Sequence, residues 1–322
     1  MKGVVMRHIL RSQQFNRTDI EELFKATDTM RKAFKSSLGR VQFRPRLLGK
    51  LMFTIFYEPS TRTRFSFAAA AIHLGMRVVG TDNAREFSSA IKGETLEDTI
   101  EVLCQYLPDV IVLRHHEAGA AERAALIGER HGVSIINAGD GKGQHPTQAL
   151  LDLYTIKQEL GRTDDIKVVL GGDLANGRTA RSLVYLLSKY KGVRLIFVSP
   201  PELRIGGDIK SHLIEHKVRF EEETFLLDAL LHAETLGRDI DVVYWTRVQR
   251  ERMENPGANF GESYRITPEI MSHLKQDAIL MHPLPRVDEI AKEVDSDPRA
   301  AYFRQAGYGM YVRMALLQEI LK

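Results

Sequence analysis

The segment at residues 58–64, Glu-Pro-Ser-Thr-Arg-Thr-Arg, combines hydroxyl side chains with arginine where a β-prone run gives way to a helical pattern. The first turn of a helix presents backbone N–H groups and the positive end of the helix dipole. Ser60, Thr61 and Thr63 add hydroxyl donors, and Arg62 adds a guanidinium fork. The segment therefore predicts a phosphate-binding site, with an ordinary helix cap and a solvated arginine as the alternative.

Other polar side chains, taken on residue type alone, favour structural interpretations. Arg114 with His115 and His116 after it reads as a polar loop, Arg178 reads as a surface residue at a helix start, and a lone histidine such as His145 is more often structural than catalytic. The residue types alone leave these alternatives open.

The elements that would position these side chains alternate between short β-prone runs and helical periodicity, which is typical of βα units around a parallel sheet. The expected strands are 51–57, 109–113, 133–137, 166–170, 193–198, 218–222, 241–246 and 278–281. Two doubly wound parallel sheets would account for them. The expected fold class is therefore α/β.

Three helices bear on how the chain is divided. Thr18 and Glu21 have the spacing of a capping box at the start of the first helix. A helix at about 146–160 leads from one half of the chain to the other. The last helix, at about 310–321, is too short to be stable alone and must dock on one half.

Composition excludes several classes of protein. The 322 residues suggest two domains of about 150 residues, and 43% apolar content suffices for a core in each. Basic and acidic residues are mixed and nearly balanced, at 45 and 42, so no nucleic-acid partner is expected. No apolar run approaches the roughly 20 residues of a membrane helix. Cys104 is the only cysteine, which favours a core role for it, excludes an internal disulfide and makes the cytoplasm the expected location.

Several motifs together closely resemble the catalytic chains of the aspartate carbamoyltransferase family, within the aspartate/ornithine carbamoyltransferase superfamily. They are FYEPSTRTRFSF at 56–67, HPTQALLDLYTI at 145–156, TRVQRER at 246–252, HPLPRVDEI at 282–290, and Gln305-Ala306-Gly307 before the terminal helix. The motifs follow the family order over nearly the whole length. The resemblance implies a carbamoyl phosphate-binding domain at 1–148, an L-aspartate-binding domain at 149–305, interdomain helices, and a C-terminal helix at about 306–322 that returns to the first domain.

The resemblance also implies an activity and a set of contacts for the first substrate. The chain would transfer the carbamoyl group of carbamoyl phosphate to L-aspartate, giving N-carbamoyl-L-aspartate and phosphate in de novo pyrimidine biosynthesis. Carbamoyl phosphate would contact Ser60, Thr61, Arg62, Thr63, Ser88, Lys92, Arg114, His145 and Gln148. Thr63, Arg114 and His145 would form the oxyanion site, with His145 as a donor to the carbonyl oxygen, because negative charge develops there.

The second substrate requires cations for two carboxylates. The resemblance assigns L-aspartate to Lys92, Arg178, Arg247 and Gln249. The backbone carbonyls of Pro283 and Leu284 would accept hydrogen bonds from the incoming amine and the carbamoyl nitrogen. The catalytic group would thus comprise Thr63, Lys92, Arg114 and His145, with no metal and no organic cofactor, since arginines and hydrogen-bond donors polarise the carbonyl.

The resemblance further implies a homotrimer with shared active sites. In the family, the serine and lysine that match Ser88 and Lys92 reach into the active site of the neighbouring subunit. Regulatory chains can join such a trimer, and the sequence leaves their presence open.

Three other functions fit the sequence less well than carbamoyl transfer to aspartate. A nucleotide-binding oxidoreductase is disfavoured because Gly171–Gly177 does not match G-x-G-x-x-G. Ornithine carbamoyltransferases share the phosphate loop but place a cysteine where this chain has Pro283. An inactive homologue that serves in assembly is disfavoured by the joint presence of Arg62, Lys92, Arg114, His145, Arg178 and Arg247.

Overall fold

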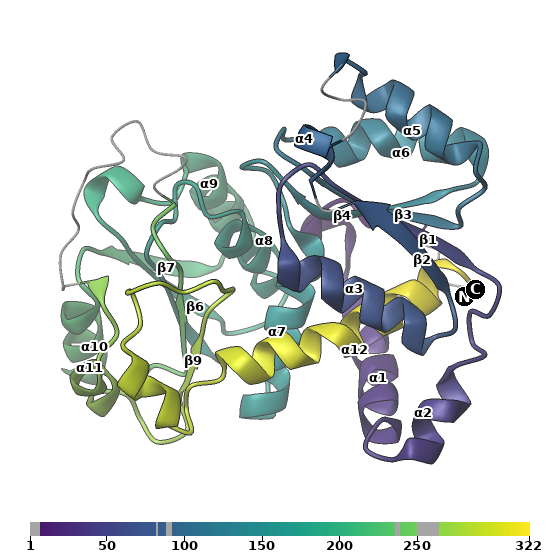
Figure 1. The fold of residues 1–322 in the computed structure, drawn as a ribbon. Helices are drawn as coiled ribbons and strands as arrows, with labels where there is room; N and C mark the ends of the chain where they lie inside the picture. Colours follow the sequence, from purple (N-terminus) through teal and green to yellow (C-terminus); the bar gives the residue numbers. More distant parts are fainter. Residues whose placement is uncertain (1–6, 82, 88–91, 236–238, 250–263) are drawn as a thin grey trace. The chain divides into compact units, whose positions relative to one another are not determined.

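The chain forms two compact units, each built around a parallel β-sheet (Figure 1). The structure, a computed structural model, describes residues 7–81, 83–87, 92–235, 239–249 and 264–322. The first unit comprises Met1–Leu151 and Gly307–Lys322, and the second comprises Asp152–Ala306. The division falls inside α7 (Pro146–Leu160) and α12 (Tyr302–Ile320), so both passages of the chain between the units are helical. The predicted α/β class with two parallel sheets is confirmed.

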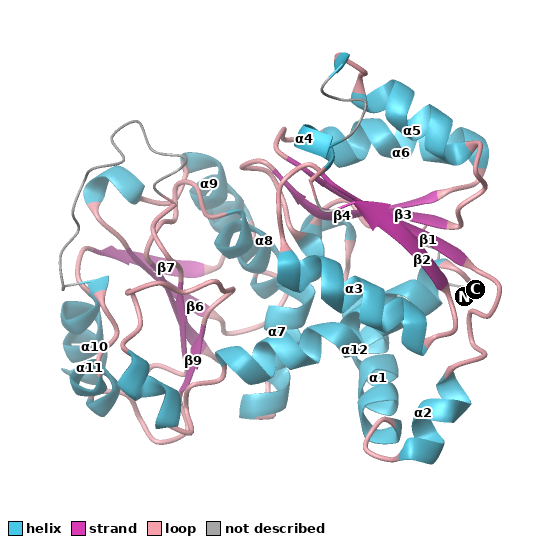
Figure 2. Ribbon diagram, in the orientation of Figure 1, coloured by secondary structure: helices cyan, strands magenta, loops and turns pink. Residues whose placement is uncertain are grey.

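The first unit has a sheet in the order β2-β1-β3-β4, with helices on both faces (Figure 2). Its remaining elements are α1 (Arg17–Ala33), α2 (Ser37–Phe43), β1 (Leu51–Phe56), α3 (Thr61–His73), β2 (Arg77–Thr81), α4 (Ala84–Phe87), α5 (Leu96–Cys104), β3 (Val110–His115), α6 (Ala120–His131) and β4 (Ser134–Asp140). Alternate residues of a strand point to opposite faces. Phe53, Ile55, Ile111 and Leu113 therefore share one face, where they pack with α5 and α6, and Cys104 lies buried in the same cluster.

Two local features of this unit differ from the sequence-based expectation. The cap of α1 is Asn16, whose side chain accepts a hydrogen bond from the Asp19 N–H at 3.0 Å, while the Asp19 carboxylate accepts one from the Asn16 N–H. The predicted capping box of Thr18 and Glu21 is therefore wrong. Strand β2 was not predicted, because it is an edge strand whose side chains are exposed or half-buried and so lack a buried apolar run.

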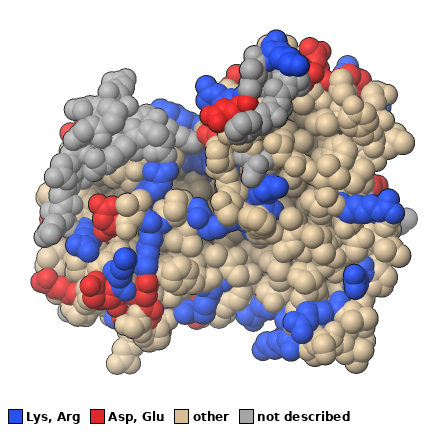
Figure 3. All heavy atoms as spheres, viewed as in Figure 1, with Lys and Arg blue, Asp and Glu red and all other residues tan. Residues whose placement is uncertain are grey.

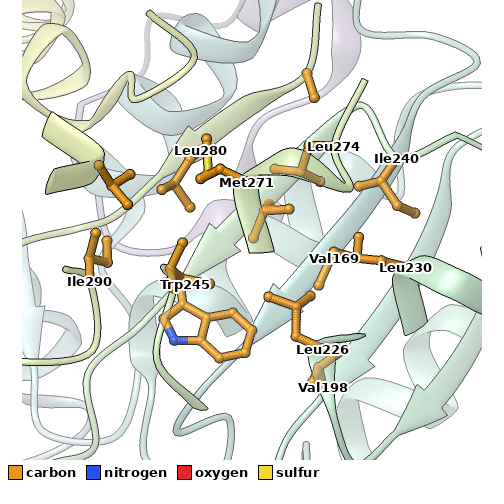
Figure 4. Packing of buried hydrophobic residues seen from close by; sticks show 14 of the residues in the cluster. Val169, Val198, Leu226, Leu230, Ile240, Trp245, Met271, Leu274, Leu280 and Ile290 are labelled. Carbon is orange, nitrogen blue, oxygen red and sulfur yellow. The ribbon is translucent and has the colours of Figure 1, made fainter. Parts of the chain in front are cut away.

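The second unit has a five-stranded sheet in the order β7-β6-β5-β8-β9, in which all neighbouring strands are parallel. Its elements are β5 (Lys167–Gly171), α8 (Arg178–Leu187), β6 (Arg194–Val198), α9 (Gly207–Glu215), β7 (Arg219–Glu223), α10 (Leu226–Thr235), β8 (Val242–Trp245), α11 (Pro268–Ser272) and β9 (Ile279–Met281). Val169, Trp245 and Leu280 pack with residues of α10 and α11 on one face of this sheet. Figure 4 shows the Trp245 ring among these aliphatic side chains.

The C-terminal helix begins earlier than expected, at Tyr302 rather than near residue 310. Its later part belongs to the first unit, where the Arg313 guanidinium donates to the Ser66 hydroxyl at 2.9 Å and lies 5.0 Å from the Phe67 ring centroid. Ser66 and Phe67 are both in α3, so the end of the chain packs against the helix that follows the predicted phosphate loop.

Charge is less evenly distributed than the composition suggests. Residues 31–50 contain basic side chains and no acidic ones, and Figure 3 shows Lys and Arg side chains gathered over α1 and α2. The expectation of mixed signs therefore fails for this segment. Within the described ranges, no helix is long and apolar enough to cross a bilayer.

Candidate active site

The predicted phosphate loop lies where β1 ends and α3 begins. Ser60 is the N-cap of α3 in an extended conformation, and the first turn of the helix carries no acidic residue. Thr61 and Arg62 are exposed, whereas Thr63 is buried. The N–H groups in the first turn of a helix have no intrahelical acceptor, so they can donate to an anion. The exposed Thr61 hydroxyl and Arg62 guanidinium can bind the same anion.

Arg114 lies beside this loop because β3 pairs with β1. The Tyr57 N–H donates to the Arg114 carbonyl at 2.8 Å, which aligns the ends of the two strands. The guanidinium then lies between two neighbours: one nitrogen is 3.4 Å from a Glu58 carboxylate oxygen, and another donates to the Ala138 carbonyl at 3.2 Å. Arg114 is thus held at the carboxyl edge of the sheet, between the phosphate loop and β4.

His145 and Gln148 lie at the start of α7, after the loop that follows β4. The His145 carbonyl accepts from the Gln148 and Ala149 N–H groups at 3.0 and 3.1 Å, so His145 caps the helix. Both side chains are buried. The structure therefore places the phosphate loop, Arg114, His145 and Gln148 at or after the carboxyl ends of three neighbouring strands of one sheet.

A buried carboxylate that the sequence did not single out shapes this edge. Asp140 is 3% exposed, and its two oxygens accept from the Gly119 N–H at 2.9 Å and the Gln144 N–H at 2.6 Å. It thereby joins the loop after β3 to the loop that ends at His145. Gly141 is required between them, because it has φ +48° and a Cβ there would lie 2.5 Å from the His116 carbonyl oxygen.

His115, expected in a polar loop, is instead a buried residue of β3. Its Nδ1 accepts from the Glu117 N–H at 3.1 Å. Burial, with the neighbouring His116 as a second cause, lowers the pKa of His115 to about 4. The ring is therefore neutral near pH 7 and serves as a structural acceptor.

The structure describes one of the two residues expected to serve a neighbouring subunit. Ser88 lies outside the described residues. Lys92 is exposed and precedes α5, whose N-cap is Thr95. Among the described residues, no carboxylate lies within ion-pair distance of the Lys92 amine.

In the second unit, the loops after β5 and β8 carry the residues expected to bind aspartate. Arg178 is the first residue of α8 and is only 5% exposed, while Arg247 and Gln249 follow β8 and are half-buried. The two loops lie close together, since the Thr246 N–H donates to the Gly171 carbonyl at 2.9 Å. Gly172 permits this approach, having φ +96° and a virtual Cβ 2.1 Å from the Thr246 carbonyl oxygen.

Asp173 holds these two loops together and was also missed by sequence reasoning. It is fully buried, and its oxygens accept from the Asn176 N–H at 2.9 Å and the Gln249 N–H at 3.0 Å. The Asn176 carbonyl in turn accepts from the Arg178 N–H at 3.1 Å. One carboxylate thus supports both Arg178 and Gln249. The available signal was an acidic residue two positions after the end of the buried strand β5.

Pro283 and Leu284 follow β9, the strand next to β8. Leu284 has φ +47°, a left-handed conformation that is uncommon for a residue with a side chain. Its N–H donates to Nδ1 of His282 at 2.8 Å. The expected aspartate-side residues thus gather at the carboxyl edge of the second sheet, as the carbamoyl phosphate residues do in the first.

Among residues 7–81, 83–87, 92–235, 239–249 and 264–322, no group of three His, Cys, Asp or Glu side chains is arranged to hold an ion. The side chains at the two sheet edges include arginines, hydroxyls, amides and a histidine.

Two family models match successive parts of the chain. Residues 7–158 match the family described as aspartate/ornithine carbamoyltransferase, carbamoyl-P binding domain, and residues 164–320 match its Asp/Orn binding domain. A protein of Oryza sativa subsp. japonica named aspartate carbamoyltransferase, chloroplastic, is 49% identical over 97% of this chain and 84% of its own length. The aspartate carbamoyltransferase catalytic subunit of Methanocaldococcus jannaschii is 45% identical over 98% of both chains.

Solved structures show the same relationship. Aspartate transcarbamoylase from Trypanosoma cruzi, in complex with carbamoyl phosphate and aspartate, superposes with a TM-score of 0.87 at 38% identity, covering 98% of this chain and 97% of that one. The catalytic subunit of the M. jannaschii enzyme gives a TM-score of 0.85 at 44% identity, covering 98% of each chain. With both halves matched and residues suited to an anion and to a dicarboxylate at the two sheet edges, this chain belongs to the aspartate/ornithine carbamoyltransferase family.

Proposed function

We propose that this protein is an aspartate carbamoyltransferase, which transfers the carbamoyl group of carbamoyl phosphate to L-aspartate and releases N-carbamoyl-L-aspartate and phosphate. The strongest support is the 45% to 49% identity, over nearly the full chain, to proteins that carry this name. The sheet edges agree with it, because one offers donors and Arg114 to a phosphate and the other offers Arg178 and Arg247 to two carboxylates. In the cell the reaction belongs to de novo pyrimidine biosynthesis.

The first half-site accounts for activation of the carbamoyl group. The first turn of α3 and Arg62 bind the phosphate, while Thr63, Arg114 and His145 donate to the carbonyl oxygen. Preorganised donors stabilise the charge that develops on this oxygen and typically contribute about 3 to 4 kcal/mol each. Gln148, beside His145 at the start of α7, binds the carbamoyl group.

The second half-site accounts for the nucleophile. Arg178, Arg247 and Gln249 hold the carboxylates of aspartate, with Lys92 as a further contact, and carbamoyl phosphate binds first. The neutral amine attacks the carbonyl carbon, and the tetrahedral intermediate expels phosphate, which accepts the proton. Side chains thus supply charge and orientation, without a general base, a metal or an organic cofactor.

Ornithine is the alternative acceptor within the same family. When its side-chain amine is the nucleophile, ornithine presents one carboxylate and a positively charged α-ammonium group where aspartate presents two carboxylates, so Arg178 and Arg247 favour aspartate. Pro283 also stands where ornithine carbamoyltransferases have a cysteine. A carbamoylation assay that offers aspartate and ornithine in parallel tests this choice: product from aspartate alone is expected, and equal turnover of ornithine would overturn the assignment.

The proposal includes a homotrimer in which Ser88 and Lys92 serve the neighbouring site. Exposed apolar side chains on α3 and β2, Phe65, Ile72 and Val79, support an interface on this side of the first unit. Sedimentation of the purified protein measures the trimer and any larger assembly with regulatory chains. A cytoplasmic location is the remaining part of the proposal, and cell fractionation tests it.

Mixing two inactive variants tests the shared site. Arg62→Ala removes a phosphate contact from the subunit's own active site, and Lys92→Ala removes a contact from the neighbouring subunit's active site. Each variant alone should therefore be nearly inactive. After random reassembly, about three quarters of trimers are mixed and about a quarter of all sites contain both residues. Recovery toward about a quarter of wild-type activity is expected. No recovery, with exchange of subunits demonstrated, would place Lys92 in its own subunit's site or in none.

A further inference from the structure

A continuous chain of buried polar side chains lies beneath the loop that follows β9. The Tyr244 hydroxyl donates to one oxygen of Asp152 at 2.8 Å, and the Gln305 amide nitrogen donates to the other at 2.6 Å. The Gln305 amide oxygen accepts from the His282 N–H at 3.0 Å. All four residues are at most 1% exposed, and all belong to the second unit.

The imidazole of His282 continues this chain into the turn at 283–285. Its Nδ1 accepts from the Leu284 N–H at 2.8 Å, so this nitrogen carries no proton. The proton of the neutral ring is therefore on Nε2, which lies 2.8 Å from a carboxylate oxygen of Glu289. The other Glu289 oxygen accepts from the Val287 N–H at 3.1 Å. One ring thus connects the start of the turn to the segment that follows it.

Buried polar chains of this kind are costly to assemble and are specific when fully paired, because each member requires its partner in a fixed place. These hydrogen-bonded side chains hold the backbone at Pro283 and Leu284. Under the proposed function, the carbonyls of these two residues accept hydrogen bonds from the reacting nitrogens. A carbonyl oriented for a nitrogen that gains positive charge during attack acts mainly in the transition state, and misplacing it lowers kcat more than it raises KM.

We propose that His282 is a positioning residue for carbamoyl transfer: its Nδ1 bond to the Leu284 N–H sets the direction of the Pro283 and Leu284 carbonyls. This inference rests on the proposed function and adds a residue that does not itself touch substrate. The chain from Tyr244 through Asp152 and Gln305 fixes the backbone of His282, and the Leu284 N–H at Nδ1 fixes the tautomer of its ring.

Two substitutions separate this role from simple packing. In His282→Asn, the amide oxygen takes the place of Nδ1 and keeps the acceptor for the Leu284 N–H. In His282→Gln, the side chain is closer to histidine in length and reaches Glu289, but it has no acceptor at the position of Nδ1. Steady-state kinetics of the full-length enzyme, with KM for each substrate and the thermal unfolding midpoint, should be compared for both variants.

The two variants should differ in kcat. His282→Gln is expected to lower kcat by about 10- to 100-fold, and His282→Asn by less than about threefold, with the KM for carbamoyl phosphate unchanged in both. A kcat for His282→Gln equal to or above that for His282→Asn would overturn the proposal. That result is expected if His282 only fills space, because glutamine is closer to histidine in volume than asparagine is. Absence of aspartate carbamoylation in the wild type would instead overturn the proposed function, and this inference with it.

A substitution one link away keeps the test decisive if neither His282 variant folds. Gln305→Met is close in size but breaks both the bond to the His282 N–H and the bond to Asp152. A several-fold lower kcat with an unchanged KM for carbamoyl phosphate would support the positioning role. Wild-type kcat in Gln305→Met would overturn it.

Discussion

Removing the Asp173 carboxylate should weaken the aspartate half-site without affecting the carbamoyl phosphate half-site. Asp173→Ala leaves the buried Asn176 N–H and the part-buried Gln249 N–H without their acceptors. Each such loss costs about 1 to 3 kcal/mol, so the free energy of unfolding should fall by about 2 to 6 kcal/mol. Asp173→Asn keeps one acceptor oxygen, and its loss should be about 1 to 3 kcal/mol.

The kinetic consequence follows from what Asp173 supports. The loop that leads into Arg178 and the loop that carries Arg247 and Gln249 would lose their common acceptor. Because misplaced contacts weaken binding and alignment together, the KM for aspartate should rise at least about tenfold at saturating carbamoyl phosphate. Urea unfolding and initial-rate kinetics on the same preparation measure both effects.

Asp140→Ala provides a matched control in the first unit. Its carboxylate likewise accepts from two N–H groups, those of Gly119 and Gln144, beside the residues for carbamoyl phosphate. It should raise the KM for carbamoyl phosphate and leave that for aspartate, at saturation, near wild type. The reasoning is refuted if both substitutions raise both KM values equally, or if Asp173→Ala leaves the KM for aspartate unchanged.

Three further predictions concern His115, His145 and Arg247. Because the pKa of His115 is about 4 in the folded chain against an ordinary 6.5, its contribution to stability is complete above pH 6.5 and is lost as the pH falls toward 4. The loss should reach about 3 kcal/mol, and His115→Gln should unfold with a correspondingly flatter pH dependence; identical profiles would contradict the reasoning. His145→Ala should lower kcat about ten- to a thousandfold, while circular dichroism shows the fold intact; unfolding without a specific kinetic defect would indicate a structural histidine. Arg247→Ala should cost about 2 to 4 kcal/mol of transition-state stabilisation, read from kcat/KM for aspartate with carbamoyl phosphate affinity as the control, and wild-type-like turnover would exclude the assigned role.

Features that depend on neighbouring residues in the chain were largely predictable. The buried strands of both sheets, such as β1 and β5, lie in largely apolar runs of the sequence. Two pairs of residues have the spacing of a capping box at the start of α1: Asn16 with Asp19, and Thr18 with Glu21. Residue type alone does not show which pair caps the helix, so the cap was placed at the wrong residue. Strand β2 lacked a signal because an edge strand need not bury its side chains.

The residues that orient the candidate site could not be predicted in the same way. Asp152 and Gln305 are 153 positions apart in the chain, and His282 meets Gln305 across 23 positions. A buried carboxylate or amide is recognised by its partners, and those partners are known only when distant segments are placed together. Motifs therefore identified groups suited to the substrates, whereas the side chains that orient the backbone beneath them required the structure.

The split of the first unit between the two ends of the chain governs how the protein can be made. Residues through Leu151 leave the ribosome first, but Arg313, which packs on α3, follows only after all of Asp152–Ala306 has been synthesised. At about 5 to 20 residues per second, this delay is on the order of 10 to 30 s. During that interval α3 lacks its C-terminal partner helix, so Ser66 and the Phe67 ring are without the side chain that contacts them in the folded protein. A stop codon anywhere before α12 would release both units incomplete.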